Sequence, residues 1–116
     1  MVGTGLRELL LRADGVGVCD DPAARLGEAQ HPVCGDVVQL SVCCRGANVE
    51  QVRWRANGCP ASMAVAALAA KVLAGVPCAE AAAVLRAAIA AHGGLAAHER
   101  HAEAMVLRAL AAAGVA

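Results

Sequence analysis

The sequence predicts an α+β fold: a small antiparallel β-sheet of two to three strands, with about three to four helices packed on one face. Two observations carry this prediction. Residues 36–44 and 49–57 alternate apolar with other side chains, as strands with one buried face do. Further along, apolar residues recur at helical spacing in the stretches 59–74, 79–92 and 97–113, and glycines follow the first two.

The composition limits what the core of this fold can be made of. The chain has 116 residues, and we expect a single domain over residues 1–116. Hydrophobic residues make up 59%, yet Phe and Tyr are absent and Trp54 is the single aromatic residue. The core is therefore built from Ala, Val and Leu, which favours closely approaching helices.

The two strands are expected to form a hairpin whose turn is residues 45–48. One face would carry Val38, Leu40, Val42, Cys44, Val52, Trp54 and Ala56. The other would face solvent and carry Val37, Gln39, Ser41, Cys43, Gln51, Arg53 and Arg55.

The remaining segments are expected to be helices and one loop. Residues 4–13 predict a short amphipathic helix, and residues 14–30 a loop with a turn of helix at 23–26. The buried stripes of the three later helices would be Ala61, Val65, Leu68 and Val72, then Val84, Leu85, Ala88 and Ile89, then Val106, Leu107 and Leu110.

Charge and cysteine content exclude several functional classes. Basic and acidic residues balance at 10 each, so nothing electrostatic favours nucleic acid or an anionic membrane as partner. The longest uncharged run, residues 56–70, is too short for a membrane span. We expect a cytoplasmic protein, where six cysteines favour metal binding or burial over disulfides.

Residues 31–36 form the first candidate motif. Cys34 and Asp36, two positions apart, project to the same side of an extended chain. Gly35 between them lacks a Cβ, so an inorganic group can approach the main chain. A turn carboxylate beside a buried thiol is the simpler explanation of this motif alone.

Further donors follow along the chain. Pro60 suits the first position of a helix and leaves Cys59 at its N-cap, where helix-end amides favour a thiolate. The predicted hairpin returns Cys59 to the neighbourhood of Cys34. His98 and His101 share one face of the last helix. Two thiolates, a carboxylate and an imidazole suit zinc or iron.

The motifs Pro32-Val33-Cys34-Gly35-Asp36 and Gly58-Cys59-Pro60-Ala61-Ser62, with two strands between them, resemble those of the NifU/IscU-type scaffolds for iron-sulfur cluster assembly. The resemblance runs from about residue 28 to 113 and implies a short strand before the first motif. It also implies a metal site of Cys34, Asp36, Cys59 and His101, because His101 stands where the family usually carries its third cysteine. His98 competes for that position.

The resemblance implies a scaffold, not an enzyme, that holds a transient [2Fe-2S] cluster or Zn²⁺. Its implied partners are a cysteine desulfurase and apo iron-sulfur recipient proteins, and a homo-oligomer is left open. The family's third cysteine usually accepts sulfur as a persulfide, so Cys59 or Cys34 would have to accept it here. A zinc-dependent sulfurtransferase is the alternative, and a purely structural zinc protein is a third hypothesis.

The remaining cysteines receive no role from the sequence. Cys43 and Cys44 are adjacent on a strand and point to opposite faces, so they cannot easily chelate one ion together. Cys19 and Cys78 lie in connectors without partners at metal spacing. His31 is either a donor to the site or a surface residue, and Met105 is expected in the core.

Overall fold

The structure is a computed structural model and describes residues 15–19, 21–31 and 35–115. Within these residues, the strands β1 (Arg25–Gln30), β2 (Val37–Arg45) and β3 (Asn48–Asn57) form one antiparallel sheet in the order β1-β2-β3. The expected helix at residues 4–13 and the residue Cys34 lie outside the described part.

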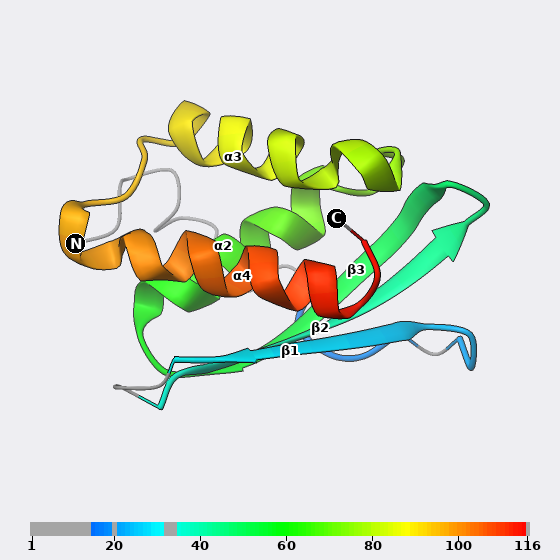
Figure 1. Cartoon of the computed structure of the whole chain (residues 1–116), viewed down its shortest axis with the longest axis horizontal. Helices are drawn as coiled ribbons and strands as arrows, with labels where there is room; N and C mark the ends of the chain where they lie inside the picture. Colours follow the sequence, from blue (N-terminus) through cyan, green and yellow to red (C-terminus); the bar gives the residue numbers. More distant parts are fainter. Residues whose placement is uncertain (1–14, 20, 32–34, 116) are drawn as a thin grey trace.

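The α-helices of the described residues lie on one face of this sheet (Figure 1). They are α2 (Pro60–Val72), α3 (Ala81–Ala91) and α4 (Arg100–Ala112), and short 3₁₀ turns at Cys78–Glu80 and Ala97–Glu99 lead into the last two. Helix α4 packs against β1 and α2 packs against β3, while α3 lies over α2 and α4. The predicted α+β class is therefore confirmed.

The hairpin of β2 and β3 matches its prediction. Val38 pairs with Ala56 and Leu40 with Trp54, and all but Ala56 of these four are almost fully buried. An irregularity between Cys43 and Cys44 shifts the register near the turn.

The strand β1 corrects one prediction and supports another. Residues 25–30 were expected to belong to a loop, and residues 23–26 to a turn of helix, because glycine and acidic residues punctuate the segment. They instead pair with β2 from Arg25↔Val42 to Gln30↔Val37. The strand implied by the family resemblance is present, because pairing with β2 outweighs weak local propensity.

The outer face of the sheet is less solvated than expected. Ser41 and Cys43 were placed on the solvent-facing side, but they are 2% and 6% exposed. The segment before β1 covers them: the Cys19 N–H donates to Ser41 Oγ at 3.1 Å, and the Cys19 thiol to the Ser41 carbonyl at 3.4 Å. The contact is long-range in sequence, so strand alternation does not reveal it.

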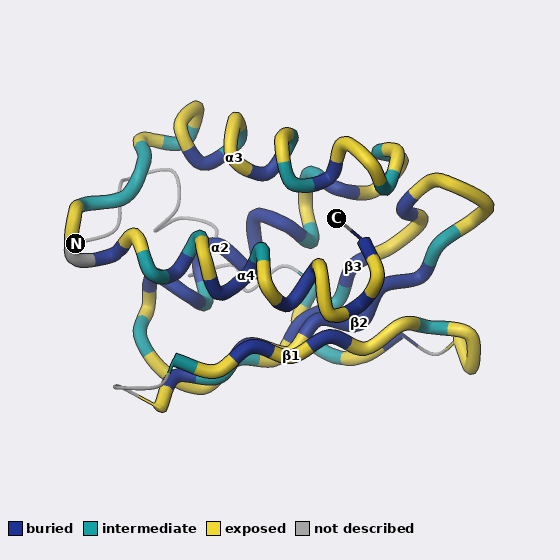
Figure 2. The backbone as a smooth tube through the Cα atoms, in the orientation of Figure 1, coloured by how far each residue is buried: buried dark blue, intermediate teal, exposed yellow. Residues whose placement is uncertain are grey.

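Helix α2 is buried on more than one side (Figure 2). A single stripe was expected, but the residues Ala61, Ser62 and Ala64 to Ala69 are all buried, because α2 lies among β3, α3 and α4. Helix α3 keeps its outer side exposed. In α4, Val106 and Leu110 are buried as expected, whereas Leu107 is only half-buried because it lies at the edge of the packed face.

Gly27 allows α4 to lie directly on β1. A Cβ built at Gly27 would overlap the Ala109 carbonyl and the Ala113 amide nitrogen, both main-chain atoms of the α4 end. Main chain cannot give way as a flexible side chain can. The close approach of helix and strand therefore requires glycine at this position.

We predict that Gly27→Ala lowers the free energy of unfolding by about 1–3 kcal/mol, because the added methyl group forces α4 away from β1. Denaturant unfolding measures this. Leu26→Ala is the matched control, since Leu26 is the neighbouring strand residue and is 70% exposed. Equal destabilisation by the two substitutions would contradict the argument.

Candidate metal centre

Asp36 lies directly before β2, where main-chain hydrogen bonds hold it. The His31 amide donates to the Asp36 carbonyl at 2.8 Å, and the Gly35 amide donates to the His31 carbonyl at 2.9 Å. Gly35 has φ +76°, a conformation that glycine adopts readily. The Asp36 side chain is buried at 8% exposure, which places a carboxylate under the rim of the sheet.

Cys59 reaches Asp36 through the register of the hairpin. Val37 pairs with Asn57, so the chain leaving β3 passes directly beside Asp36. Cys59 is the N-cap of α2, with Pro60 at the first helical position, as predicted. Its amide donates to Asp36 Oδ2 at 3.3 Å. The carboxylate thus accepts a main-chain hydrogen bond at the start of the helix, where the helix dipole favours negative charge.

Gly58 makes the contact between these two residues possible. Its φ is +148°, and a Cβ built on it would overlap the carboxylate group of Asp36. Sequence reasoning included Gly58 in the second motif but gave it no separate role. No local sequence pattern reveals this role of Gly58, because only the pairing of β2 with β3 places Asp36 against this position.

His101 completes the cluster from the first turn of α4. Its Nε2 atom lies 3.3 Å from Cys59 Sγ and 3.7 Å from Asp36 Oδ2. One donor atom from each of the three residues lies within 4.8 Å of the other two. Asp36 is buried while Cys59 and His101 are half-buried, so the donor group is open to solvent on one side.

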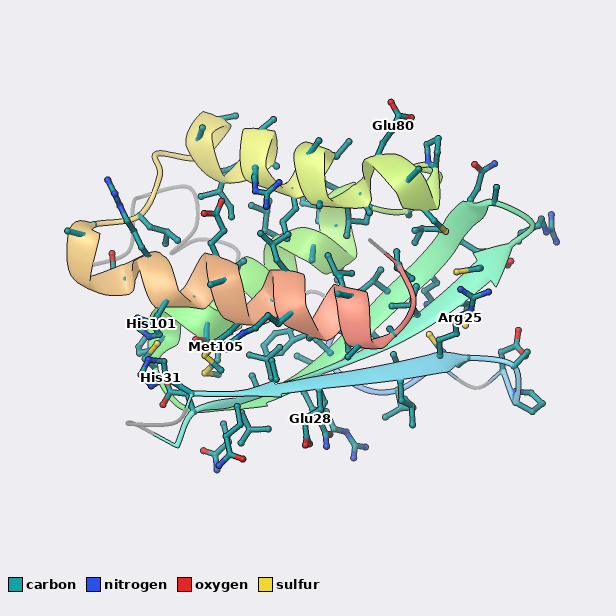
Figure 3. The ribbon with its side chains drawn as sticks, viewed as in Figure 1. Arg25, Glu28, His31, Glu80, His101 and Met105 are labelled. Atoms are coloured by element: carbon teal, nitrogen blue, oxygen red, sulfur yellow. The ribbon has the colours of Figure 1, made fainter. Side chains whose placement is uncertain are left out.

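His31 also belongs to this neighbourhood (Figure 3). Its ring packs edge-on against the His101 ring, with centroids 5.1 Å apart and planes inclined at 70°. The sequence left its role open between a donor to the site and a surface residue. The geometry places it beside the candidate ligand His101.

Ser62 and Met105 lie beneath the cluster. Ser62 Oγ is 3.3 Å from Cys59 Sγ and donates to Met105 Sδ at 3.9 Å. Met105 is fully buried, which confirms the expectation of a core residue. Ser62 is also buried, and the sequence gave it no separate role. The Ser62 hydroxyl therefore lies between the Cys59 thiol and the buried Met105 side chain.

The donor set fits a zinc or iron ion. A thiolate, a carboxylate and an imidazole are borderline-soft to hard ligands, and their mutual separations match those of atoms that surround one ion. Among the residues that the structure describes, no other group of three such side chains is comparably close. Three of the four candidates from the sequence, Asp36, Cys59 and His101, therefore come together. The fourth, Cys34, and the side chain of the competing His98 lie outside what is described.

Four further cysteines lie away from this cluster, and all are free thiols. Burial, followed by a side-chain hydrogen bond with Cys19, raises the pKa of the Cys43 thiol to about 12. Cys44 instead lies 3.7 Å, sulfur to sulfur, from Cys78. Cys43 and Cys44 thus contact different partners, in agreement with the expectation that they do not act together.

The NifU-like N-terminal domain model matches residues 12–116. The chain belongs to the NifU-like N-terminal domain family. This match covers both cysteine motifs and His101. No curated protein matches the chain.

Solved structures share the NifU-like fold at low sequence identity. A candidate iron-sulfur cluster assembly scaffold protein for the SUF system of Fervidobacterium islandicum AW-1 has a TM-score of 0.71 and 17% identity, over 97% of this chain and 93% of that one. A nitrogen-fixing NifU-like protein (N-terminal) from Brucella abortus has a TM-score of 0.68 and 16% identity, over 97% and 89%. A third structure, of a hypothetical protein, has a TM-score of 0.60 and 24% identity, over 92% and 79%.

No helix in the described part of this NifU-like domain is long and apolar enough to cross a membrane.

We predict that Gly58→Ala weakens metal binding about tenfold or more, because the new methyl group displaces the Asp36 carboxylate. Titration with Co²⁺, followed by its visible absorption, measures this affinity. Gly46→Ala is the control, since Gly46 also has positive φ, +61°, but faces open space. Wild-type affinity in Gly58→Ala would show that Asp36 does not contribute to the site.

Proposed function

We propose that this NifU-like protein is a scaffold on which iron-sulfur clusters are assembled and from which they are transferred. The observation that carries the proposal is the convergence of Asp36, Cys59 and His101 donor atoms within 4.8 Å. Family membership supports it. So does the fold shared with a candidate cluster assembly scaffold of the SUF system.

The proposed ligands are Cys34, Asp36, Cys59 and His101. Cys34 is assigned from its motif alone, two positions before Asp36 in the sequence. His101 is preferred to His98 because its Nε2 is 3.3 Å from Cys59 Sγ. The cargo is a transient [2Fe-2S] cluster, and Zn²⁺ is the proposed occupant of the resting protein.

The mixed donor set suits a temporary site. Two thiolates, a carboxylate and an imidazole hold an iron-sulfur cluster less firmly than four thiolates do. Asp36 supplies the hard, exchangeable oxygen ligand, held in place by the Cys59 amide. Because Cys59 and His101 are half-exposed, iron and sulfide can enter and the cluster can leave without unfolding of the core.

Sulfur would come from a cysteine desulfurase. A thiolate of Cys59 or Cys34 attacks the outer sulfur of the enzyme's persulfide, takes that sulfur and releases the enzyme's cysteine thiolate. Two electrons from a redox protein then reduce the bound sulfur to sulfide. The imidazole of His101 cannot accept sulfur in this way, so its role is that of a ligand.

The proposal also covers where the protein acts and which partners it has. The protein acts in the cytoplasm as a single domain over residues 1–116, hands the cluster to apo iron-sulfur proteins, and is not itself an enzyme. Neither nucleic acid nor membrane is a proposed partner, and self-association into a homo-oligomer is compatible with this function.

A zinc-dependent sulfurtransferase is the second candidate, because one thiolate, one carboxylate and one imidazole lie close enough to share Zn²⁺. In that mechanism, Cys59 or Cys34 leaves the metal to attack the persulfide. Sulfur turnover with a desulfurase in the absence of iron, with no cluster formed, would favour this second function over the scaffold.

We predict that anaerobic reconstitution with iron and sulfide gives the visible absorption of a cluster in the wild type. Cys59→Ala and Cys34→Ala should lose most of this absorption, because each removes a thiolate ligand. Cys43→Ala is the matched control, since that thiol is buried elsewhere in the sheet. Full reconstitution of Cys59→Ala would rule out the proposed site.

We predict a higher cluster reduction potential in the wild type than in His101→Cys, by on the order of 100 mV, because a neutral imidazole makes the cluster less negative than a thiolate does. Protein-film electrochemistry of the two reconstituted proteins measures this difference. An equal or lower wild-type potential would exclude His101 as a cluster ligand.

A further inference from the structure

A pair of neighbouring thiols, Cys44 and Cys78, lies at the end of the sheet opposite the candidate metal centre. Cys44 Sγ is 3.7 Å from Cys78 Sγ, the sulfur of a residue 34 positions along the chain. Cys44 is eight positions beyond Asp36 on β2, a difference that places it roughly 25 Å away at the rise of a strand. The pair therefore takes no part in holding the cluster.

Main-chain hydrogen bonds fix the two thiols next to each other. The segment that leads to α3 runs beside the start of β3, where the Val49 amide donates to the Val76 carbonyl at 2.8 Å. The Cys78 amide donates to the Ala47 carbonyl, also at 2.8 Å, and so ties Cys78 to the hairpin turn. The contact between the sulfurs is thus part of the fold.

Accessibility separates this pair from Cys19 and Cys43. Cys44 and Cys78 are both half-buried, so a small oxidant can reach them. Cys19 and Cys43 are buried, at 8% and 6% exposure. The pair is thus accessible, and Cys43, one residue away on β2, is a buried thiol that serves as an internal comparison.

We propose that Cys44 and Cys78 are an oxidisable thiol pair that a hydroperoxide closes to an intramolecular disulfide. The Cys78 thiolate attacks one peroxide oxygen and breaks the O–O bond, which gives a sulfenic acid and, after protonation, an alcohol or water. The Cys44 sulfur then attacks the sulfenic sulfur, and one water leaves. Together the two thiols lose two electrons, and the peroxide gains them.

The order of attack follows from the environment of Cys44. Burial raises the pKa of the Cys44 thiol, and its hydrogen bond to Cys78 raises it further. The raised pKa favours the protonated form of Cys44, so we assign Cys78 as the first nucleophile. Cys44 needs to lose its proton only in the second step.

The disulfide would join the end of β2 to the segment before α3. The closed loop, residues 44–78, contains β3, α2 and the candidate ligand Cys59. Cross-linking restricts the unfolded chain, so oxidation should stabilise the sheet and helix that carry Cys59. The pair would thus protect the fold under oxidising conditions without using a ligand of the cluster.

Mass spectrometry of the full chain tests the proposal. The protein is treated with a few equivalents of hydrogen peroxide, blocked with an alkylating reagent and digested with trypsin. Cleavage after Arg25, Arg45, Lys71 and Arg86 places Cys44 in peptide 26–45 and Cys78 alone in peptide 72–86. Peptide 26–45 also contains Cys34 and Cys43, which the reagent alkylates. We expect the two peptides to be linked, with a mass about 2 Da below their sum once the alkyl groups on Cys34 and Cys43 are added, and to separate on addition of dithiothreitol.

Three variants identify the cysteines that form the disulfide between the two peptides. Cys44→Ser and Cys78→Ser should each lower its yield at least about tenfold, whereas Cys43→Ser should retain it, because the Cys43 thiol is buried. The melting temperature should rise on oxidation in the wild type and in Cys43→Ser, and return on reduction. The proposal is overturned if the two peptides stay unlinked while peroxide consumes other thiols, or if the link persists in Cys44→Ser.

Discussion

The antiparallel pairing of β2 with β3 is the constraint on which the candidate metal centre depends. Val37 pairs with Asn57, so the residue before one strand and the residues after the other leave the sheet at the same edge. Asp36 and Cys59 consequently meet, and the Cys59 amide binds the carboxylate. A slip of one residue would turn Val38, Leu40 and Trp54 out of the core. The apolar core thereby fixes the geometry of a polar site.

The third donor depends on how α4 lies on the sheet. Gly27 lets the end of this helix rest directly on β1, and the same helix begins at the rim where Asp36 and Cys59 meet. The interior consists mostly of alanine, valine and leucine, with Trp54 as its aromatic residue. Small side chains let helices and strands approach closely, and a close approach positions His101 more narrowly than a loosely packed helix would.

The cysteines of the described residues differ in solvent exposure and in the groups that they contact. Cys59 is half-exposed at the rim among polar donors, where a metal can reach it. Cys43 is buried, and its raised pKa, about 12, keeps the thiol protonated and unreactive. Cys44 and Cys78 lie between these extremes, accessible and in contact with each other. The candidate metal donors and the thiol pair proposed to be oxidisable therefore lie at opposite ends of the sheet.

The sequence by itself determined the hairpin, the three later helices, the N-cap position of Cys59 and the family, because these depend on local periodicity, capping and short motifs. It also named Asp36, Cys59 and His101 as donors, together with Cys34, which lies outside the described residues. Only the tertiary structure decided that β1 pairs with β2, that Cys19 covers Ser41, and that His31 packs against His101. It alone paired Cys44 with Cys78. These contacts join residues far apart in the chain, and no local preference encodes which distant partner a side chain will meet.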